Sequence, residues 1–193
     1  MARTKEFDPD VALRAALGLF WERGYEATST SDVVARLGIG RASVYATFGS
    51  KHELYLRALD RYAEQTDPRL LEELSQPGAV LPAVRALVRR FAEKAGSERR
   101  TLGCFVTNTA AELAAHDREA ARRVEAGWDH LETLLHSALV RAAARGELAA
   151  ERDPRGIARL LVVLMQGMRV VGKAATDPGR VRDAAEQALT LLD

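Results

Sequence analysis

The chain has 193 residues, of which 47% are hydrophobic, and this length is enough for one medium core or two small ones. Its formal net charge is +1, with 28 Lys and Arg against 27 Asp and Glu, which excludes a uniformly cationic nucleic-acid coat. The sequence contains no apolar run of about 18 residues and no cleavable signal pattern, so we expect a cytoplasmic protein with no membrane partner.

The first predicted helix begins at Asp8 and Pro9. An aspartate caps free backbone N–H groups, and proline is well suited to the first helical turn. Leu13, Leu17 and Phe20 then follow at helical spacing, so we expect them to form the buried stripe of this helix.

Residues 28–51 predict two short helices joined by a tight turn. Ser29 and Asp32 have the spacing of a helix cap, so the first short helix is expected to begin near Thr30. Gly38 follows the last apolar residue of that helix, where a left-handed backbone conformation would end it. This layout of helix, turn and helix is typical of a segment that lies in a DNA groove.

The second short helix is predicted to open at Gly40 and Arg41, with Val44 and Phe48 on its inner face. Small side chains and hydroxyls on the remaining faces allow close approach to base edges. We expect Arg41 to bind guanine, because its guanidinium fork matches two acceptors on that base. The residues on these other faces are Arg41, Ala42, Ser43, Tyr45, Ala46 and Thr47.

A third helix is predicted to start at Ser50, with Lys51 in its first turn. A cation there opposes the helix dipole, so a phosphate partner explains it better than helix stability does. From Arg36 to Arg61 there are five cations and two acids. This small local surplus gives modest affinity for DNA, so useful binding is expected to need two copies of the chain.

The rest of the chain also predicts helices, and we find no alternating strand segment. We therefore expect an all-α fold of about nine helices, with a helix-turn-helix DNA-binding head at 1–50, a connecting helix at 50–66 and a second domain at 67–193. The expected later segments are a helix ending near residue 74, a helix from 81 to a break at 96, a polar loop at 97–101, a helix at 102–115, a long helix at 117–145, a helix from 154, a break at Asp177, Pro178 and Gly179, and a final helix through 192.

The helix that follows Pro154 is apolar almost all round, from Ile157 to Val171. Such a helix is either covered on its outer side by a partner or lies at the centre of a core.

An effector cavity is expected in the second domain, because an apolar setting with a few polar groups is what a small-molecule site needs. Its candidate lining is Cys104, Phe105, Asn108, Trp128, Met165 and Met168. The alternative is that these residues belong to the core, with Asn108 bonded to backbone. Cys104 is the only cysteine, so it forms no intramolecular disulfide and is either a small buried group or a thiolate sensor.

The sequence gives little support to an enzyme. His52, His116, His130 and His136 have no spacing that places two of them on one helix face beside a carboxylate, so we expect no metal site. A phosphate-cradling glycine loop and a nucleophile elbow are both missing from the sequence, and no cofactor is expected.

About the first third of the chain resembles the TetR family of bacterial transcriptional regulators. The resemblance rests on Leu19 to Ser29, Val33 to Lys51 and His52 to Leu59. It implies phosphate contacts by Ser29, Thr30, Tyr45 and Lys51, and base contacts by Arg41, Ala42, Ser43, Ala46 and Thr47. It also implies a homodimer built through the last two helices. The Gly103–Cys104 pair is similar to a segment of family members that respond to electrophiles, oxidants or metal.

The resulting expectation is a one-component repressor that binds a palindromic double-stranded DNA operator as a dimer and leaves it when a small-molecule effector binds. The alternatives are a thiol or redox sensor acting through Cys104, an activator or architectural DNA binder without a ligand, and an interaction module that has lost DNA binding. The intact head, with Arg41 and Lys51, argues against the last of these.

Overall fold

The computed structural model describes residues 7–174, 177 and 179–193. Over these residues it contains nine α-helices and no strand, which confirms the all-α prediction. None of the helices within these ranges is long and apolar enough to cross a membrane. The elements are α1 (Pro9–Arg23), α2 (Thr30–Leu37), α3 (Arg41–Phe48), α4 (Lys51–Leu74), α5 (Leu81–Gly96), the 3-10 helix η1 (Glu98–Leu102), α6 (Phe105–Glu112), α7 (Arg118–Ala144), α8 (Pro154–Ala174), α9 (Gly179–Leu189) and the 3-10 helix η2 (Thr190–Leu192).

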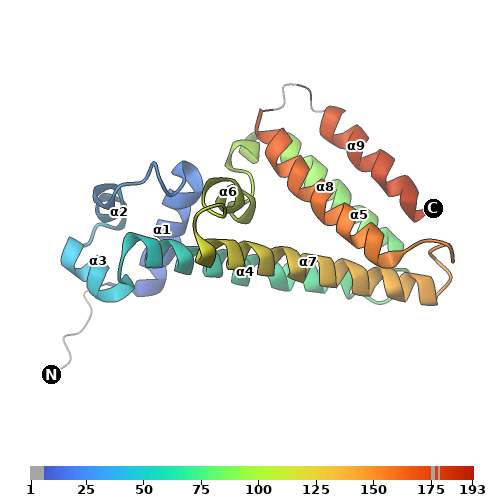
Figure 1. Cartoon of the computed structure of the whole chain (residues 1–193), viewed down its shortest axis with the longest axis horizontal. Coiled ribbons are helices and arrows are strands. Elements are labelled where there is room, and N and C mark those ends of the chain that lie inside the picture. Colours follow the sequence, from blue (N-terminus) through green and yellow to red (C-terminus); the bar gives the residue numbers. More distant parts are fainter. Residues whose placement is uncertain (1–6, 175–176, 178) are drawn as a thin grey trace.

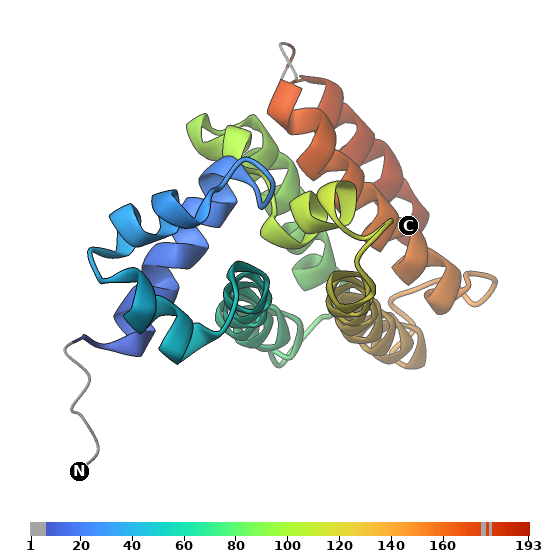
Figure 2. The ribbon, with the colours of Figure 1, turned by 60° about the vertical axis from the view of Figure 1, so that its left-hand side comes forward.

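The molecule is elongated, with a small head at one end and a helical bundle at the other (Figure 1). Helices α1, α2 and α3 form the head together with the first turns of α4. The long helices α4 and α7 pack against each other, and α5, α8 and α9 complete the bundle (Figures 1 and 2). Helix α4 therefore connects the head to the bundle.

Local side-chain caps fix the helices of the head. In α2 the Ser29 hydroxyl accepts from the Asp32 N–H at 3.1 Å, and the Asp32 carboxylate accepts from the Ser29 N–H at 2.8 Å. The same reciprocal cap joins Ser50 and Glu53 at the start of α4. Gly38 has a φ of +66°, a left-handed conformation that glycine adopts without steric cost, so α2 ends there and the chain turns into α3.

The buried residues form two hydrophobic clusters. The larger one lies in the bundle and includes Leu87, Leu135 and Leu161. The other fills the head, but it also takes in Phe105 of α6 and Ala120 of α7. The head thus shares its core with residues far beyond the connecting helix, and it is not an isolated packing unit.

Three of the predicted segments differ in the structure: the loop at 97–101, the helix at 102–115 and the final helix through 192. The segment expected as a polar loop at 97–101 is the 3-10 helix η1, and the helix expected at 102–115 is α6, which begins only at Phe105. Gly103 separates them with a φ of +62°, which an α-helix does not accommodate. The last α-helix ends at Leu189, after which η2 continues to Leu192. Pro178, expected to help separate the last two helices, lies outside the described residues.

Candidate nucleic-acid interface and effector cavity

Helix α3 presents a polar face to solvent at the end of the head. Its inner face is anchored by Val44 and Phe48, both buried in the head cluster. The opposite side carries the exposed residues Arg41, Ala42, Ser43 and Ala46, while Tyr45 and Thr47 are half-buried. Most of the side chains predicted to face bases therefore lie together on the open side of α3.

Tyr45 joins the two helices of the motif. Its hydroxyl donates to the Thr30 Oγ1 at 3.2 Å, which links α3 to the first residue of α2. The Arg41 guanidinium lies 5.6 Å from the centre of the Tyr45 ring. The structure thus brings Thr30, Arg41 and Tyr45 into one group at the surface.

Lys51 has a structural role that the sequence reasoning did not foresee. Its ammonium donates to the carbonyls of Tyr25 and Thr28, each at 2.9 Å, and lies 3.9 Å from the centre of the Tyr25 ring. These contacts hold the loop between α1 and α2 against the start of α4. An ammonium has three donors, so one remains for a phosphate. Ser29, beside this loop, is exposed and engaged in the α2 cap.

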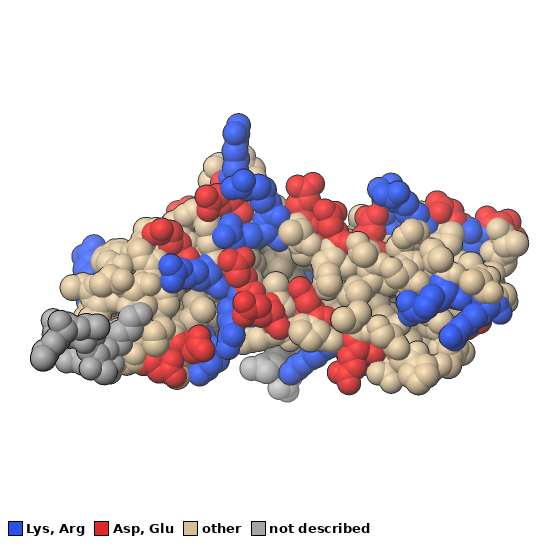
Figure 3. Space-filling view, turned by 90° about the horizontal axis from the view of Figure 1, so that it is seen from below, with Lys and Arg blue, Asp and Glu red and all other residues tan. Residues whose placement is uncertain are grey.

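The head is not a continuous basic surface. Basic and acidic side chains are both scattered among uncharged residues on the face shown in Figure 3. Arg23 pairs with Asp32 at 3.2 Å, and Arg36 pairs with Glu22 at 2.6 Å. Any electrostatic attraction to DNA must therefore come from a few individual cations at specific positions and not from a broad positive field.

Arg57 is a further cation that the sequence reasoning did not assign to the site. It is exposed on α4, and its guanidinium donates to the Thr47 carbonyl near the end of α3 at 3.3 Å. The only signal in the sequence was its charge, since ten positions separate it from its partner.

Glu112 connects the head to α6 through two hydrogen bonds. The carboxylate of this residue accepts from the Tyr25 N–H at 3.0 Å and from the Glu26 N–H at 2.8 Å. The chain approaches it closely at Gly24, whose φ is +85°, and a Cβ at that position would lie 2.9 Å from a carboxylate oxygen. Glycine is therefore required at this turn.

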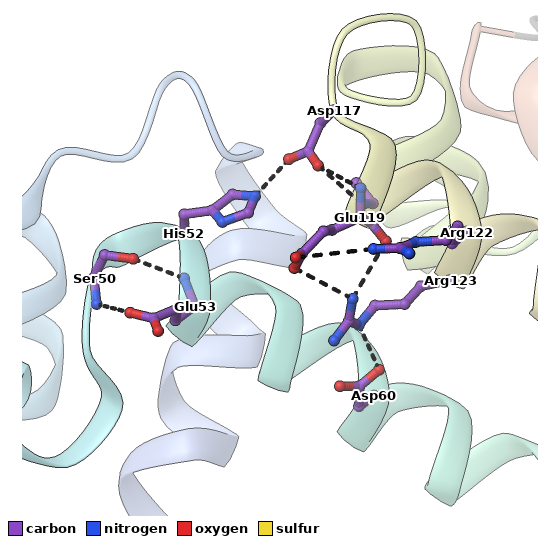
Figure 4. A network of polar contacts seen from close by, with 9 residues as sticks. Ser50, His52, Glu53, Asp60, Asp117, Glu119, Arg122 and Arg123 are labelled. Atoms are coloured by element: carbon purple, nitrogen blue, oxygen red, sulfur yellow. Dashed lines mark hydrogen bonds and ion pairs between the residues drawn. The ribbon is translucent and has the colours of Figure 1, made fainter.

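A second polar contact joins the first turn of α4 to the start of α7 (Figure 4). The His52 imidazole lies 2.5 Å from the Asp117 carboxylate, which also caps α7 by accepting from the N–H groups of Glu119 and Ala120. Burial raises the pKa of Asp117, but the hydrogen bonds from the Ala120 N–H and from His52 outweigh it, and the pKa is lowered. Farther along, Arg123 donates to Asp60 of α4 at 2.9 Å.

A cavity of about 810 Å³ lies where the head meets the bundle. Trp21 of α1 forms part of its wall, and the indole N–H donates to the Leu102 carbonyl at 3.0 Å. A smaller cavity of about 320 Å³ has several lining residues in common with it, so the two adjoin. The shared residues are Tyr62, Thr66, Arg69, Lys94 and Arg169.

Two of the six residues predicted to line an effector site do line the smaller cavity. Cys104 is half-buried and lies 3.6 Å from the Tyr62 hydroxyl, which donates to its sulfur. Trp128 lies across the same cavity on α7.

The other four line neither cavity. Phe105 packs between the rings of Tyr55 and Tyr62 in the head cluster, with centroid distances of 5.2 and 5.9 Å. Asn108 donates to the Leu102 carbonyl and accepts from Lys173. Met165 and Met168 are buried in the bundle cluster because they lie on the inner face of α8. Sequence spacing alone does not distinguish the inner face of a helix from the wall of a cavity.

Helix α8 leaves an apolar row uncovered. Leu160, Val163, Val170 and Val171 are exposed by 44%, 70%, 55% and 40%. Their spacing places them on one side of the helix, opposite Ala158 and Met165, which are buried. A contiguous apolar face of this kind is typical of a protein interface.

Two family models match the chain. Residues 12–58 match the model described as bacterial regulatory proteins, tetR family, and residues 80–189 match the one described as tetracyclin repressor-like, C-terminal domain. The HTH-type transcriptional regulator YezE of Bacillus subtilis (strain 168) is 35% identical over the full length of both chains. The HTH-type transcriptional repressor ComR of Escherichia coli (strain K12) is 30% identical over 98% of this chain and 90% of its own length.

Among solved structures, a cysteine mutant of the regulator CifR complexed with 26-bp double-strand operator DNA is 29% identical, with a TM-score of 0.82 over 97% of this chain and 98% of its own. These similarities extend over both the head and the bundle.

Proposed function

The chain belongs to the TetR family of bacterial regulatory proteins, and we propose that it is a repressor that binds a palindromic operator as a homodimer and leaves it when a small-molecule effector binds. Membership makes it a DNA-binding transcriptional regulator and not an enzyme. A regulator of this kind would act in the bacterial cytoplasm, where the chromosome lies.

The exposed face of α3 is the observation that carries the proposal. Its small residues allow the helix to enter the major groove, where Arg41 would bind guanine. Ala42, Ser43, Ala46 and Thr47 would face the neighbouring bases. Ser29, Thr30, Tyr45 and Lys51 would hold phosphates on either side and fix the position of the helix. CifR, a relative of similar fold, was solved on its operator.

The apolar row on α8 supports a homodimer built through α8 and α9. Burial of four aliphatic side chains against the same row of a second copy would remove them from water. The twofold axis would place two α3 helices about 34–36 Å apart, which matches half-sites separated by one turn of DNA. Two copies would also double the small positive surplus of one head.

Release would follow from the position of the cavity. Its wall includes Trp21 of the head and four residues of α4, so a ligand there touches both parts that set the orientation of α3. A ligand that fits only one orientation shifts the equilibrium toward it. We therefore expect effector binding to change the separation of the two heads and weaken operator binding.

A footprint on the DNA upstream of the gene of this protein tests the proposal. We expect protection of a near-palindromic sequence, loss of protection with Arg41→Ala, and higher reporter transcription when the gene is deleted. Lower transcription on deletion would make the protein an activator, and the absence of any protected sequence would contradict operator binding at this locus.

Thiol chemistry at Cys104 is a second candidate for the release step. The sulfur lies in the wall of the smaller cavity beside the Tyr62 hydroxyl, so an electrophile that enters can reach it. N-ethylmaleimide treatment of wild type and Cys104→Ser, followed by operator titration, tests this candidate. Selective loss of operator binding in the wild type supports it, and equal behaviour of the two proteins rejects it.

A further inference from the structure

The larger cavity is lined by cations without any carboxylate. Arg69 of α4, Lys94 of α5, Arg100 of η1 and Arg169 of α8 contribute to its wall, and neither Asp nor Glu does. Among the side chains that the structure describes, no carboxylate forms an ion pair with any of these four. Four separate elements thus direct positive charge to one concave surface.

The positive charges gathered here repel one another. Burial and the nearby guanidinium groups of Arg169 and Arg90 lower the pKa of Lys94, because they disfavour its charged form. The Nε–H groups of Arg100 and Arg169 are buried and have no hydrogen-bond partner. Buried donors without acceptors cost stability, and an anion in the cavity would offset the mutual repulsion of the cations.

The adjoining smaller cavity is largely apolar. Leu70, Phe91, Trp128 and Leu131 contribute to its wall, and the Arg169 guanidinium lies 4.6 Å from the centre of the Phe91 ring. The Trp128 indole N–H is buried without a partner. The three cations that the cavities share, Arg69, Lys94 and Arg169, therefore stand at the boundary between an apolar and a polar compartment.

The carboxylates of the smaller cavity do not neutralise this boundary. Glu73 forms an ion pair with Arg90. Asp67 remains, and its carboxylate accepts from the Thr66 hydroxyl at 3.5 Å. One carboxylate against three shared cations leaves the boundary positive.

We propose that the site takes a small organic anion, a carboxylate attached to an aromatic or aliphatic body, and that this anion is the effector. The carboxylate binds Lys94 and the planar guanidinium groups, which match its two oxygens, and the body fills the apolar compartment. The effector role rests on the proposed function, whereas binding of the anion to the free protein does not.

The chain carries its own reporters for this test. It has only two tryptophans, Trp21 in the wall of the larger cavity and Trp128 in that of the smaller one. The probes are benzoate, salicylate, cinnamate and hexanoate, each compared with its neutral amide of the same shape. We expect at least one carboxylate to raise the Tm and change the tryptophan fluorescence, and its amide to do neither at the same concentration.

Substitutions locate the binding site. Lys94→Gln and Arg169→Gln are each expected to weaken carboxylate binding about tenfold or more, the loss of one charge-assisted interaction. Arg122→Gln is the matched control, since it removes the same kind of charge from an exposed position on α7 away from the cavities. The free Lys94→Gln protein should be at least as stable as wild type, because a repulsion is relieved. A far-ultraviolet spectrum checks that each variant is folded.

The outcomes separate this proposal from the operator proposal. Amides that bind as well as their carboxylates, a panel in which no carboxylate binds, or Arg122→Gln weakening binding as much as Lys94→Gln would each overturn the anion site. A carboxylate that binds the free protein but leaves operator affinity unchanged would overturn its role as effector. If the protein protects no operator DNA when no carboxylate or amide is present, that result contradicts the proposed function and leaves the anion site untouched.

Discussion

Glu112→Ala should weaken the contact between the head and α6. The carboxylate accepts two backbone N–H groups, from Tyr25 and Glu26, and each hydrogen bond to a charged group contributes about 1.5–3 kcal/mol. Glu26 is exposed and Tyr25 half-buried, so the lower value applies and the pair contributes about 3 kcal/mol. With a urea dependence of about 2 kcal/mol per molar, the unfolding midpoint should fall by about 1.5 M.

The assay is urea unfolding followed by circular dichroism, with Glu125→Ala as the control. Glu125 is an exposed acid on α7, so its removal changes the net charge equally without breaking the contact with the head. Operator affinity should also fall for Glu112→Ala, because the loop from Gly24 to Ser29 sets the start of α2. Equal midpoints for the two variants would refute the role assigned to Glu112.

Four further outcomes are expected. Arg41→Ala should cost about 1–3 kcal/mol of operator affinity and relax one base position, whereas unchanged specificity in a binding-site selection would remove Arg41 from base recognition. Lys51→Met should lower the free energy of unfolding by about 1–2 kcal/mol, since two hydrogen bonds to carbonyls are lost. It should also reduce the slope of operator affinity against salt concentration, because a phosphate contact is lost. An unchanged slope would leave Lys51 a purely structural role. Val163→Glu should convert a dimer to a folded monomer in light scattering, and a dimer of unchanged mass would move the interface away from α8. The lowered pKa of Asp117 stabilises the fold at a pH above about 3.9, the value for an unfolded aspartate, and this contribution is lost as the pH falls through the lower folded value. Asp117→Asn should therefore lose less stability than wild type as the pH falls through the acid range. If the two proteins lose stability equally with acid, the Asp117 carboxylate does not carry that pH dependence.

The head could be predicted from sequence because its signals are local. Ser29 with Asp32 is separated by three positions, and the left-handed turn at Gly38 follows directly from the residue type. The exposed face of α3 followed from the spacing of Val44 and Phe48. Each of these patterns lies within one or two helical turns, so it can be recognised without knowledge of the tertiary structure.

The cavity could not be predicted in the same way. Arg69, Lys94 and Arg169 come from three helices, and no local sequence pattern distinguishes any of them from an ordinary solvated cation. Met165 and Met168 were assigned to the cavity because their type fits an apolar wall, but which side of α8 faces the core depends on tertiary packing. The structural use of Lys51 was missed for a related reason, since its partners, the carbonyls of Tyr25 and Thr28, precede it by more than twenty positions.

Trp21 couples the cavity to the position of the head. It belongs to α1, yet it forms part of the wall where we place the ligand. A ligand that weakens DNA binding by shifting this indole must itself bind more weakly, by the same factor, when DNA holds the head in place. Operator DNA would thus act as an antagonist of the effector, and a promoter-bound dimer would need a higher effector concentration than a free one to respond.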